Sequence, residues 1–441
     1  MEEHRNVGGQ NYDQTLSYLY DLQKYGIKFG LSSTSSLLGR IGNPQAGLKT
    51  IHIAGTNGKG STAAMLSAIL VRAGFKVGLY TSPHLVRFNE RFRLNEQDIG
   101  DQEIIDVFQA VRAVVDEREP PTFFEMTTAM ALSLFAEKGV DWAILEVGMG
   151  GRLDATNVVQ PQLTIINNVS FDHQEFLGST LSRIAREKAG IIKKQVPLIT
   201  AVTQPVALAV IKTRCSALNA PCYRIGRQIK VRTLGEQRFS YSGLGWRLEN
   251  LHVPLAGRHQ VMNAATALGG LEVLERWGYY NLDAEQIREG LVKTRWPGRL
   301  ELLGMKPPVL LDGAHNYAGI VALRQALQEQ YTYRRLIVVL GIMADKDLRG
   351  MFLILAPLAE RIILTRPTYE RAAEPESLWA VAGEFAERTE LIRPVGEALE
   401  RAMGLATFED LVLVTGSLYF IGEVKEIKEA KKRAKPVKYR G

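Results

Sequence analysis

The residues best suited to chemistry lie in a glycine-rich segment, residues 51–62, with the sequence IHIAGTNGKGST. It reads as a buried strand, a tight turn and the start of a helix. Backbone N–H groups in such a turn, together with the positive end of the helix, attract phosphate. Lys59 adds a charge suited to β- and γ-phosphates, and Ser61 or Thr62 offers a hydroxyl suited to Mg²⁺. We therefore predict a nucleoside triphosphate site rather than an ordinary turn with a solvated lysine.

The spacing in this loop departs from the most common phosphate-binding pattern. In that pattern a Ser or Thr follows the lysine directly, whereas here Gly60 stands between Lys59 and Ser61. The loop therefore belongs to a particular variant of the nucleotide-binding motif.

Polar residues follow or end several apolar segments that read as strands. They are Ser82, Glu146 and the pair Asp172 and His173. In an open parallel sheet, ligands bind beyond the carboxyl ends of the strands. Mg²⁺ takes few protein ligands, most of them oxygen, so Ser82, Glu146 and His173 could supply them. An unpaired Glu146 beside an apolar run would be costly, which favours a metal or basic partner. His173 alone could equally be a hydrogen-bonded loop histidine.

Alternating strands and helices position these residues. The predicted strands are residues 49–53, 76–80, 142–147, 163–166 and 198–201, and the predicted helices are residues 15–24, 61–73, 101–117 and 124–137. This alternation predicts an α/β fold with a doubly wound parallel sheet. Short strands between Arg224 and Pro254 predict a small attached antiparallel sheet. Helices at 260–277 and from the cap Asp283 to 293 follow it.

The segment Trp296–Arg299, with the sequence WPGR, is the predicted domain boundary. Pro-Gly breaks regular structure, and the strand–helix alternation restarts after it, with strands at 309–312, 336–340, 361–365 and 411–415. A chain of 441 residues is too long for one ordinary core. We predict an N-terminal ATP-binding domain, residues 1–296, and a C-terminal Rossmann-like α/β domain, residues 297–441.

Composition narrows the class of protein. With 46% hydrophobic and 23% charged residues, the chain is typical of a soluble globular protein. No apolar run approaches the roughly 20 residues of a membrane helix, and Met1–Gln10 is too polar for a signal peptide. Cys215 and Cys222 suit reduced thiols in a cytoplasmic protein. The net charge of +7, partly in residues 425–440, suits an enzyme that handles anions. A solvated helix end explains this tail better than nucleic-acid binding.

Several motifs, in order along nearly the whole chain, resemble folylpolyglutamate synthase and the bifunctional dihydrofolate synthase/folylpolyglutamate synthase of the Mur ligase superfamily. These motifs are HIAGTNGKGS (52–61), YTSPHL (80–85), FE (124–125), EVGMGGRLDATN (146–157), DH (172–173), EKAGI (187–191), PGR (297–299) and LDGAHN (311–316). The additional Gly60 is itself characteristic of this family. The resemblance implies an ATP-dependent ligase that joins a folate carboxylate to the α-amine of glutamate.

The resemblance also implies roles for individual residues. The implied nucleotide contacts are Asn57, Gly58, Lys59, Gly60, Ser61, Asn263, Arg299 and Asp312. The implied Mg²⁺ ligands are Ser82, Glu146 and His173. The implied folate contacts are Thr122, Phe123, Phe124, Glu125, Leu153, Asp154 and Ala155. The implied catalytic residues are Lys59, Lys188, His173, Arg299 and His315.

The implied cofactors are ATP, Mg²⁺ at two sites and K⁺. Carbamylation of Lys188 would turn a cation into an anion able to bind the second Mg²⁺. The implied partners are reduced folate, dihydropteroate and L-glutamate, for a cytoplasmic monomer that binds neither nucleic acid nor membrane.

From the residues alone, several of these positions have simpler explanations. Lys188, in a predicted helix, would be a solvated lysine. Arg299 could pair with Glu301, and Asp312 could cap the following turn. The aromatic pair 123–124 fits a core better than a stacking surface.

An amine does not displace oxide from a carboxylate at neutral pH, so we expect ATP to activate the carboxylate as an acyl phosphate. The alternatives are a monofunctional folylpolyglutamate synthase, a cell-wall Mur ligase, a nucleotide switch or kinase that forms no amide bond, and a non-catalytic binding protein. Gly60 and the segment 153–155 argue against the cell-wall enzyme. Candidate ATP contacts in both predicted domains argue against a simple switch.

Overall fold

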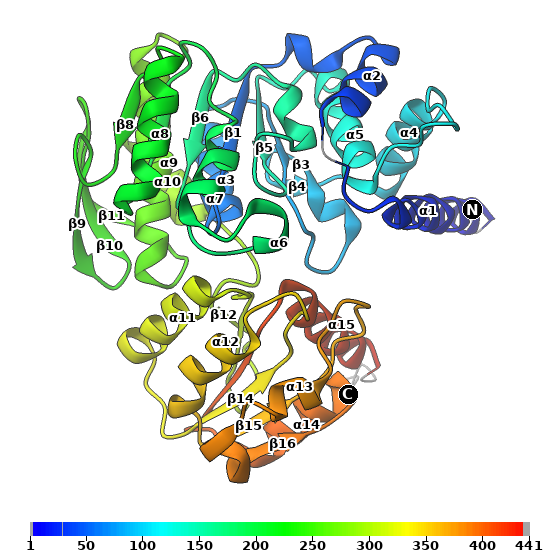
Figure 1. The fold of residues 1–441 in the computed structure, drawn as a ribbon, viewed down its shortest axis with the longest axis vertical. Coiled ribbons are helices and arrows are strands. Elements are labelled where there is room, and N and C mark those ends of the chain that lie inside the picture. The colour runs from blue at the N-terminus through cyan, green and yellow to red at the C-terminus, as the bar shows by residue number, and fades with distance from the viewer. Residues whose placement is uncertain (1–2, 29, 435–441) are drawn as a thin grey trace, which may run out of the picture. The chain divides into compact units, whose positions relative to one another are not determined.

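The computed structural model describes the backbone of residues 3–28 and 30–434 and the side chains of residues 11–28 and 30–430. The chain packs into two units (Figure 1). Unit 1 contains the chain up to Ser170, Gln174–Pro254 and His259–Arg295, and unit 2 contains Phe171–His173, Leu255–Arg258 and the chain from Trp296 onward. That residues 1–296 and 297–441 are separate domains stays a prediction. The side chains of Met1–Gln10 and of the tail beyond residue 430 lie outside the described residues.

Unit 1 is built on an eight-stranded sheet with the order β4-β3-β2-β5-β1-β6-β7-β8. The strands are β1 (Thr50–Ala54), β2 (Val77–Tyr80), β3 (Phe92–Leu94), β4 (Gln97–Asp98), β5 (Trp142–Glu146), β6 (Leu163–Ile166), β7 (Leu198–Thr200) and β8 (Cys222–Arg224). The six from β2 to β8 are parallel, and β3 and β4 add an antiparallel edge. The doubly wound parallel sheet is confirmed, and the antiparallel edge was not predicted.

Strand β1 occupies the centre of this sheet, between β5 and β6. Ile53 lies opposite Glu146 on one side and Ile165 on the other. All five residues of β1 are buried, as a strand covered on both faces requires. The register therefore brings the ends of three neighbouring strands to the same edge as the phosphate-binding loop.

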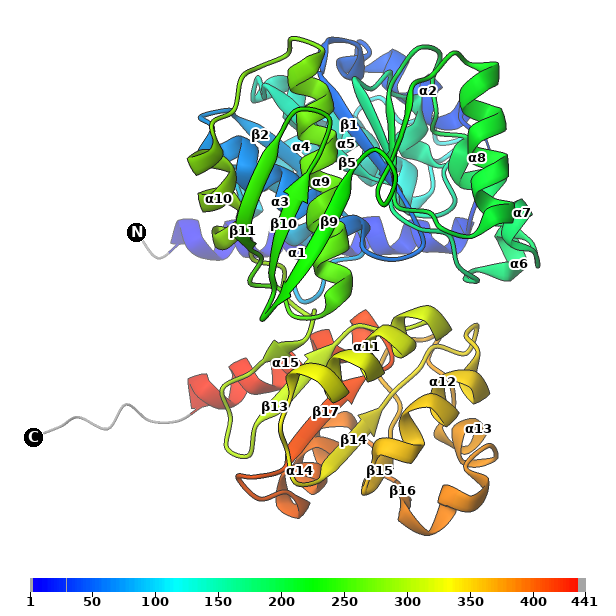
Figure 2. The same cartoon turned by 90° about the vertical axis from the view of Figure 1, so that its left-hand side faces the viewer.

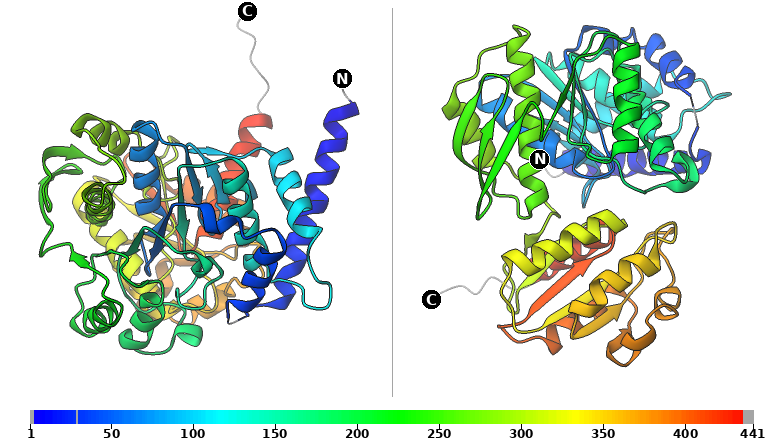
Figure 3. Two further views of the ribbon diagram at one scale, coloured as in Figure 1. Left: turned by 90° about the horizontal axis from the view of Figure 1, so that it is seen from above. Right: turned by 60° about the vertical axis from the view of Figure 1, so that its left-hand side comes forward.

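Helices cover both faces of the sheet. They are α1 (Glu3–Asp21), α2 (Ser32–Arg40), α3 (Lys59–Arg72), α4 (Asp101–Arg112), α5 (Phe123–Glu137), α6 (Gln174–Leu177), α7 (Leu181–Ala189), α8 (Pro205–Ala217), α9 (Arg258–Arg276) and α10 (Ala284–Lys293). Helix α3 packs on β2 and β5 and contacts α10, whereas α5 contacts α1, α2 and α4. Figure 3 (left) shows α1 beside α4 at the outer side of this layer.

Two helices differ from the prediction by several residues, and the others by one or two. The helix predicted at 15–24 already begins at Glu3 as α1 and ends in a short 3₁₀ turn, Leu22–Tyr25. The helix predicted at 101–117 ends at Arg112. Beyond it, the Asp116 carboxylate accepts a hydrogen bond from the backbone N–H of Arg118 at 3.0 Å. Such a side-chain bond offers the backbone a turn in place of another helical turn.

The region between Arg224 and Pro254 contains the predicted antiparallel sheet. Its strands are β9 (Lys230–Gly235), β10 (Arg238–Ser242) and β11 (Arg247–His252), in the order β11-β10-β9. Figure 2 shows this sheet in front of α9. The turn between β9 and β10 contains Glu236 and Gln237, both at positive φ, 46° and 60°.

One buried carboxylate fastens this sheet to α9. The side chain of Glu272 accepts a hydrogen bond from the Tyr241 hydroxyl at 2.6 Å. It also accepts the backbone N–H groups of Gly245 and Trp246, the latter at 2.6 Å. Glu272 is 0% exposed, so these three donors replace the water that an ionised carboxylate would otherwise require.

Unit 2 is a second α/β sheet, with the order β12-β13-β17-β14-β15-β16. Its elements are β12 (Glu301–Leu302), β13 (Val309–Asp312), β14 (Leu336–Leu340), β15 (Arg361–Leu364), β16 (Thr389–Leu391), β17 (Leu411–Thr415), α11 (Tyr317–Gln330), α12 (Leu348–Leu355), α13 (Pro375–Trp379), α14 (Val395–Leu405) and α15 (Leu418–Ala434). Only β12 is antiparallel to its neighbour among the described strands of this sheet. Helices α11 and α12 lie side by side over the sheet (Figure 3, right). The four predicted strands are confirmed; β12 and β16 were not predicted.

Two expectations from composition are consistent with this fold. Cys215, buried on α8, and Cys222, half-buried at the start of β8, are both free thiols. Among the described helices, none has the length and hydropathy needed to cross a membrane.

The anchoring role of Glu272 can be tested by mutation. In Glu272→Ala, the Tyr241 hydroxyl and two backbone N–H groups lose their acceptor inside the protein. We expect a loss of about 3 kcal/mol in the free energy of unfolding, measured by urea denaturation. Glu249 is exposed on β11, so the control Glu249→Ala should change stability by less than about 0.5 kcal/mol. Equal effects of the two substitutions would contradict the anchoring role.

Candidate active site

The loop between β1 and α3 brings its lysine back over its own backbone. Gly58 has a φ of 81°, and α3 begins at Lys59. A Cβ atom at residue 58 would lie 2.4 Å from Oδ1 of Asn263 on α9, so glycine is required there. Nζ of Lys59 donates hydrogen bonds to the carbonyl oxygens of Gly55, at 3.2 Å, and Thr56, at 3.4 Å. The structure therefore places Lys59 and Asn263 at the same loop.

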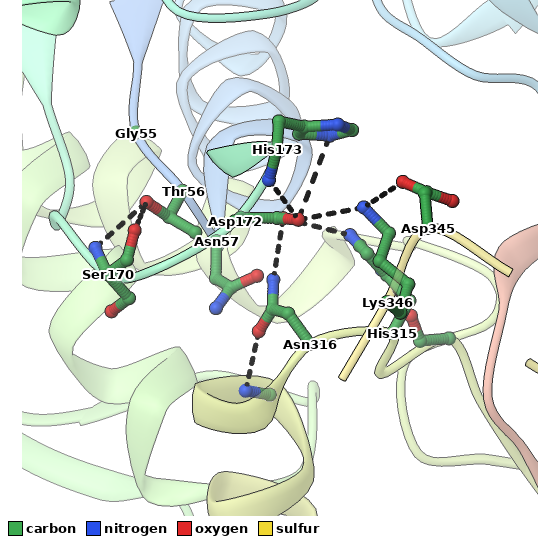
Figure 4. A network of polar contacts seen from close by, with 12 residues as sticks. Gly55, Thr56, Asn57, Ser170, Asp172, His173, His315, Asn316, Asp345 and Lys346 are labelled. Atoms are coloured by element: carbon green, nitrogen blue, oxygen red, sulfur yellow. Dashed lines mark hydrogen bonds and ion pairs between the residues drawn. The ribbon is translucent and has the colours of Figure 1, made fainter. Parts of the chain in front are cut away.

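Polar residues after β6 hold this loop in place, and the sequence analysis did not single them out. Asn168 binds Asn57 twice: its Oδ1 accepts from the backbone N–H at 2.9 Å, and its Nδ2 donates to the carbonyl at 3.0 Å. The Thr56 hydroxyl donates to the carbonyl of Ser170 at 3.1 Å and accepts from its N–H at 3.0 Å (Figure 4). The sequence signal that could have identified these residues is the run of polar side chains directly after the apolar strand β6, which pairs with β1.

The two hydroxyls at the start of α3 have different surroundings. Thr62 Oγ1 accepts a hydrogen bond from Nδ2 of Asn167 at 2.8 Å. Ser61 is equally buried, and the described residues give its hydroxyl no such bond. This difference favours Ser61 over Thr62 as the hydroxyl available to a ligand.

Strand order explains why Glu146 lies beside the loop. Strand β5 ends at Glu146 and pairs with both β1 and β2. The Oε1 atom of Glu146 is 3.8 Å from Nζ of Lys59, and its Oε2 accepts the backbone N–H of Ser82 at 3.3 Å. The carboxylate is 5% exposed. Glu146, Ser82 and Lys59 thus meet at one edge of the sheet, where a carboxylate and a hydroxyl offer the oxygen ligands that Mg²⁺ prefers.

Asp172 is the centre of a polar cluster in unit 2 (Figure 4). Its carboxylate accepts hydrogen bonds from Nζ of Lys346 at 2.8 Å, Nδ2 of Asn316 at 2.9 Å and the backbone N–H of His173 at 2.9 Å. Nε2 of His315 lies 3.7 Å away. Burial raises the pKa of Asp172, but His315, His173 and Lys346 outweigh it and hold that pKa well below the usual range. The carboxylate is therefore ionised at neutral pH.

The two histidines of this cluster are oriented by their neighbours. Nδ1 of His315 lies 2.9 Å from the carbonyl oxygen of Gly313, which can only accept, so Nδ1 carries a hydrogen. Nε2 then faces Asp172. Burial is the main reason that the pKa of His173 is lowered to about 4; Asp172 opposes this shift and Lys346 adds to it. His173 is therefore neutral at pH 7.

The structure separates the predicted metal ligands into two groups. Ser82 and Glu146 lie together within unit 1, and His173 is assigned to unit 2. That the three residues form one ligand set stays a prediction. Within the described part of the chain, no three His, Cys, Asp or Glu side chains are arranged as a metal site. Lys346 was not singled out from the sequence, because the apolar residues Ile342 and Met343 separate it from the end of β14.

Residues predicted to contact folate form the start of α5. Thr122 caps this helix: its hydroxyl accepts the N–H of Glu125 at 3.2 Å, while Oε2 of Glu125 accepts the N–H of Thr122 at 2.7 Å. The other oxygen of Glu125, Oε1, is buried and has no hydrogen-bond partner among the described residues. A buried oxygen of this kind favours a donor from outside the chain.

The two phenylalanines at the start of α5 contact other aromatic rings. Phe123 stacks on Tyr20, with ring centroids 5.9 Å apart, and the Arg91 guanidinium lies 5.0 Å from its centroid. Phe124 lies 6.0 Å from the ring of Tyr80. Both phenylalanines are half-buried and pack against the hydrophobic core.

The segment 153–155 is fixed by a buried aspartate. Asp154 accepts the N–H of Thr156 at 3.0 Å and that of Met149 at 3.0 Å. Leu153 is half-buried and Ala155 is buried. Asp154 is therefore a loop-forming residue as well as a predicted folate contact.

Lys188 is not a solvated lysine. It lies in the last turn of α7 and is 3% exposed. Neighbouring Glu187 is the residue that faces outward and pairs with Arg152 at 2.9 Å. Burial of the Lys188 side chain is consistent with its predicted role, which stays a prediction.

The two predicted nucleotide contacts of unit 2 have different local roles. Asp312 accepts the backbone N–H groups of Leu300, at 3.0 Å, and Ala314, at 2.9 Å, and so does cap the turn after β13. The alternative pairing of Arg299 with Glu301 is not observed. Glu301 instead binds Lys425 at 2.8 Å.

Comparison with known proteins relates both units to one family. The family described as "Mur ligase middle domain" matches residues 53–271, and "Mur ligase, glutamate ligase domain" matches residues 298–418. The dihydrofolate synthase/folylpolyglutamate synthase of Bacillus subtilis (strain 168) is 37% identical, over 94% of this chain and 98% of that protein.

Solved structures give the same result. The Mycobacterium tuberculosis folylpolyglutamate synthase, complexed with ADP and AMPPCP, has a TM-score of 0.88 at 31% identity and covers 94% of this chain and 98% of that chain. E. coli FolC, in complex with DHPP and ADP, has a TM-score of 0.87 at 32% identity and covers 95% and 98%.

The geometry of the Asp172 cluster yields a stability prediction. Asp172→Asn would leave the Lys346 ammonium, 7% exposed, without its buried counter-charge. We expect a loss of about 3 kcal/mol in the free energy of unfolding. The control is Asp345→Asn, because Asp345 is also 3.1 Å from Lys346 but is 32% exposed. It should cost less than about 1 kcal/mol. Urea denaturation of both variants checks the difference, and a larger loss for Asp345→Asn would refute it.

Proposed function

Because the chain belongs to the Mur ligase family and, within it, to the dihydrofolate synthases/folylpolyglutamate synthases, we propose that it adds glutamate to folates with ATP as the driving reactant. It is an ATP-dependent ligase of the bifunctional kind, which acts on dihydropteroate and on folates that already carry glutamate. The observation that carries this function is the Lys59–Glu146–Ser82 arrangement beside the phosphate loop, in a chain related over nearly its whole length to such ligases. The cell-wall ligase, the switch and the binding protein are therefore set aside.

We propose that Asn57, Gly58, Lys59, Gly60 and Ser61 hold the triphosphate. The relatives of known structure bind ADP and AMPPCP, which supports a nucleotide at the same fold position. The backbone N–H groups at the start of α3 face outward from the positive helix end. Asn263 would add a contact from α9, because its side chain lies against Gly58.

Ser82 and Glu146 fit a magnesium ion by the chemistry of their donors, a hydroxyl and a carboxylate. Mg²⁺ bound there would neutralise phosphate charge. His173 as a third ligand, a second Mg²⁺ with carbamylated Lys188, and K⁺ stay predictions. So do the roles of Arg299, Asp312 and His315, the monomeric state and the cytoplasmic location.

The reaction proceeds in two steps. A folate carboxylate oxygen attacks the γ-phosphorus of ATP, so that an acyl phosphate forms and ADP leaves. The α-amine of glutamate then attacks the acyl carbon, loses a proton, and expels inorganic phosphate. Lys59 would stabilise the charge that develops on the phosphoryl oxygens, since its ammonium is held at the loop. Most of the rate enhancement in such a step comes from positioning and charge neutralisation.

The folate would lie against residues 122–125 and 153–155. Two features of the first segment support this. Oε1 of Glu125 is a buried acceptor without a partner among the described residues, and Phe124 is a half-buried aromatic ring. Aromatic faces suit the flat ring of a folate.

The activity is tested by ADP release. We expect release that requires glutamate together with either dihydropteroate or tetrahydrofolate, and only background release without a folate. Mass analysis of the products should show dihydrofolate in one case and an added glutamate in the other. ADP release that does not depend on any folate would refute the ligase function.

The loop and strand-end roles are tested by substitution. Lys59→Ala and Glu146→Ala should each reduce folate-dependent ADP release by at least about 10²-fold, because each removes charge next to the transferring phosphoryl group. Lys49→Ala is the matched control, since Lys49 is exposed just before β1. Wild-type turnover in either site variant would remove that residue from the mechanism.

A further inference from the structure

His52 is a titratable residue that the mechanism above does not use. It lies on β1, three residues before the phosphate loop begins at Gly55, and is 0% exposed. Its backbone lies opposite Leu145 on β5 and Thr164 on β6. The ring therefore sits in the centre of unit 1, where an unsatisfied polar group would be costly.

The hydrogen-bond partner of the ring is Thr156. Nε2 of His52 lies 2.8 Å from Oγ1 of Thr156. The same Oγ1 also hydrogen-bonds to Oδ1 of Asp154. One hydroxyl thus joins a ring on the central strand to a carboxylate in the segment predicted to contact folate.

The positions of the hydrogens follow from what each group can donate. Burial raises the pKa of the Asp154 carboxyl, whereas hydrogen bonds from the Thr156 hydroxyl and from the backbone N–H groups of Met149 and Thr156 lower it. The Thr156 hydroxyl is the donor to Oδ1 of Asp154. The single hydroxyl hydrogen of Thr156 therefore points to Asp154. Nε2 of His52 must then be the donor to Thr156. The hydrogen bonds run in one direction, from His52 through Thr156 to Asp154.

The other ring nitrogen is consistent with this assignment. Nδ1 of His52 is buried and has no hydrogen-bond partner among the described residues. Burial, with a smaller contribution from the charge of Lys193, lowers the pKa of His52 to about 3. The ring is neutral and has one hydrogen, which Thr156 binds at Nε2. Because Nδ1 carries no hydrogen, the ring has no buried hydrogen-bond donor that lacks an acceptor.

We propose that His52 and Thr156 are positioning residues for the folate substrate, which act by fixing the orientation of the Asp154 carboxylate. The inference rests on the proposed function, since it takes Asp154 as a folate contact. Thr156 holds Oδ1 and the backbone N–H of Met149 holds Oδ2, so the carboxylate keeps one orientation and the remaining acceptor position of Oδ2 keeps one direction. That position suits a ring N–H donor of the folate. Neither residue touches the substrate itself.

The test compares two substitutions at one position. Thr156→Val removes the hydroxyl while keeping the shape, and Thr156→Ser keeps the hydroxyl. We expect Thr156→Val to raise the KM for dihydropteroate by about tenfold, with the KM for ATP and for glutamate unchanged. Thr156→Ser should behave as the wild type. A purely structural role would lower kcat or stability without this selective change in KM.

Failure of the inference and failure of the proposed function give different results. A wild-type protein without folate-dependent ADP release refutes the function. Wild-type activity combined with an unchanged dihydropteroate KM in Thr156→Val overturns the positioning role, as does an equal change in all three KM values.

A spectroscopic measurement tests the hydrogen assignment independently, and it applies even if Thr156→Val does not fold. In protein labelled with ¹⁵N at histidine, the His52 signals are those lost in His52→Gln. We expect them to show a hydrogen on Nε2 and none on Nδ1 at pH 7. A ring protonated at Nδ1, or at both nitrogens, would overturn the proposal.

Discussion

A carboxylate can be buried only where hydrogen-bond donors replace the water it loses, and this constraint recurs at each important position of the chain. Glu272 fastens the antiparallel sheet to α9 in this way. Asp154 holds the loop after β5, Asp312 the turn after β13, and Asp172 the cluster of unit 2. Each of these carboxylates gathers backbone or side-chain donors at one point, and Glu272 draws them from a different element of the fold. The loops that carry the candidate functional residues are therefore fixed by charge as well as by the apolar core.

The order of strands determines which residues can act together in unit 1. Strand β1 lies between β5 and β6, so the phosphate loop has the end of one on each side. From β5 comes Glu146, and from the chain after β6 come the residues that brace the loop, Asn168 and Ser170. The carboxylate that lies next to Lys59 therefore comes from the strand on one side of β1, and the residues that hydrogen-bond to the loop come from the chain after the strand on the other side. The His52 ring lies on that same strand and is joined through Thr156 to Asp154, in the segment that we propose contacts folate.

Much of the fold could be predicted from sequence because its strands are apolar runs bounded by glycine or polar residues, and the strand at 163–166 has the predicted limits. Edge strands such as β3, β4 and β12 were not predicted, since their pairing depends on partners distant in sequence. In the site, glycines and a lysine at fixed spacing marked the loop. Asn168 follows an apolar strand but belongs to no motif of fixed spacing, and Lys346 lies six residues beyond β14, so only the fold shows what they bind. The assignment of His173 to unit 2 could not be predicted either, because the sequence shows only that His173 follows a strand of unit 1.

The turn of the small antiparallel sheet has a practical consequence. Glu236 and Gln237 form the connection between β9 and β10, and both hold positive φ angles. Glu236 is exposed, and the sheet behind it is held to α9 by Glu272 rather than by the turn. The chain can therefore be opened at this point without loosening the sheet. A fluorescent peptide could be inserted there to report on unit 1, or new chain ends could be placed there by circular permutation.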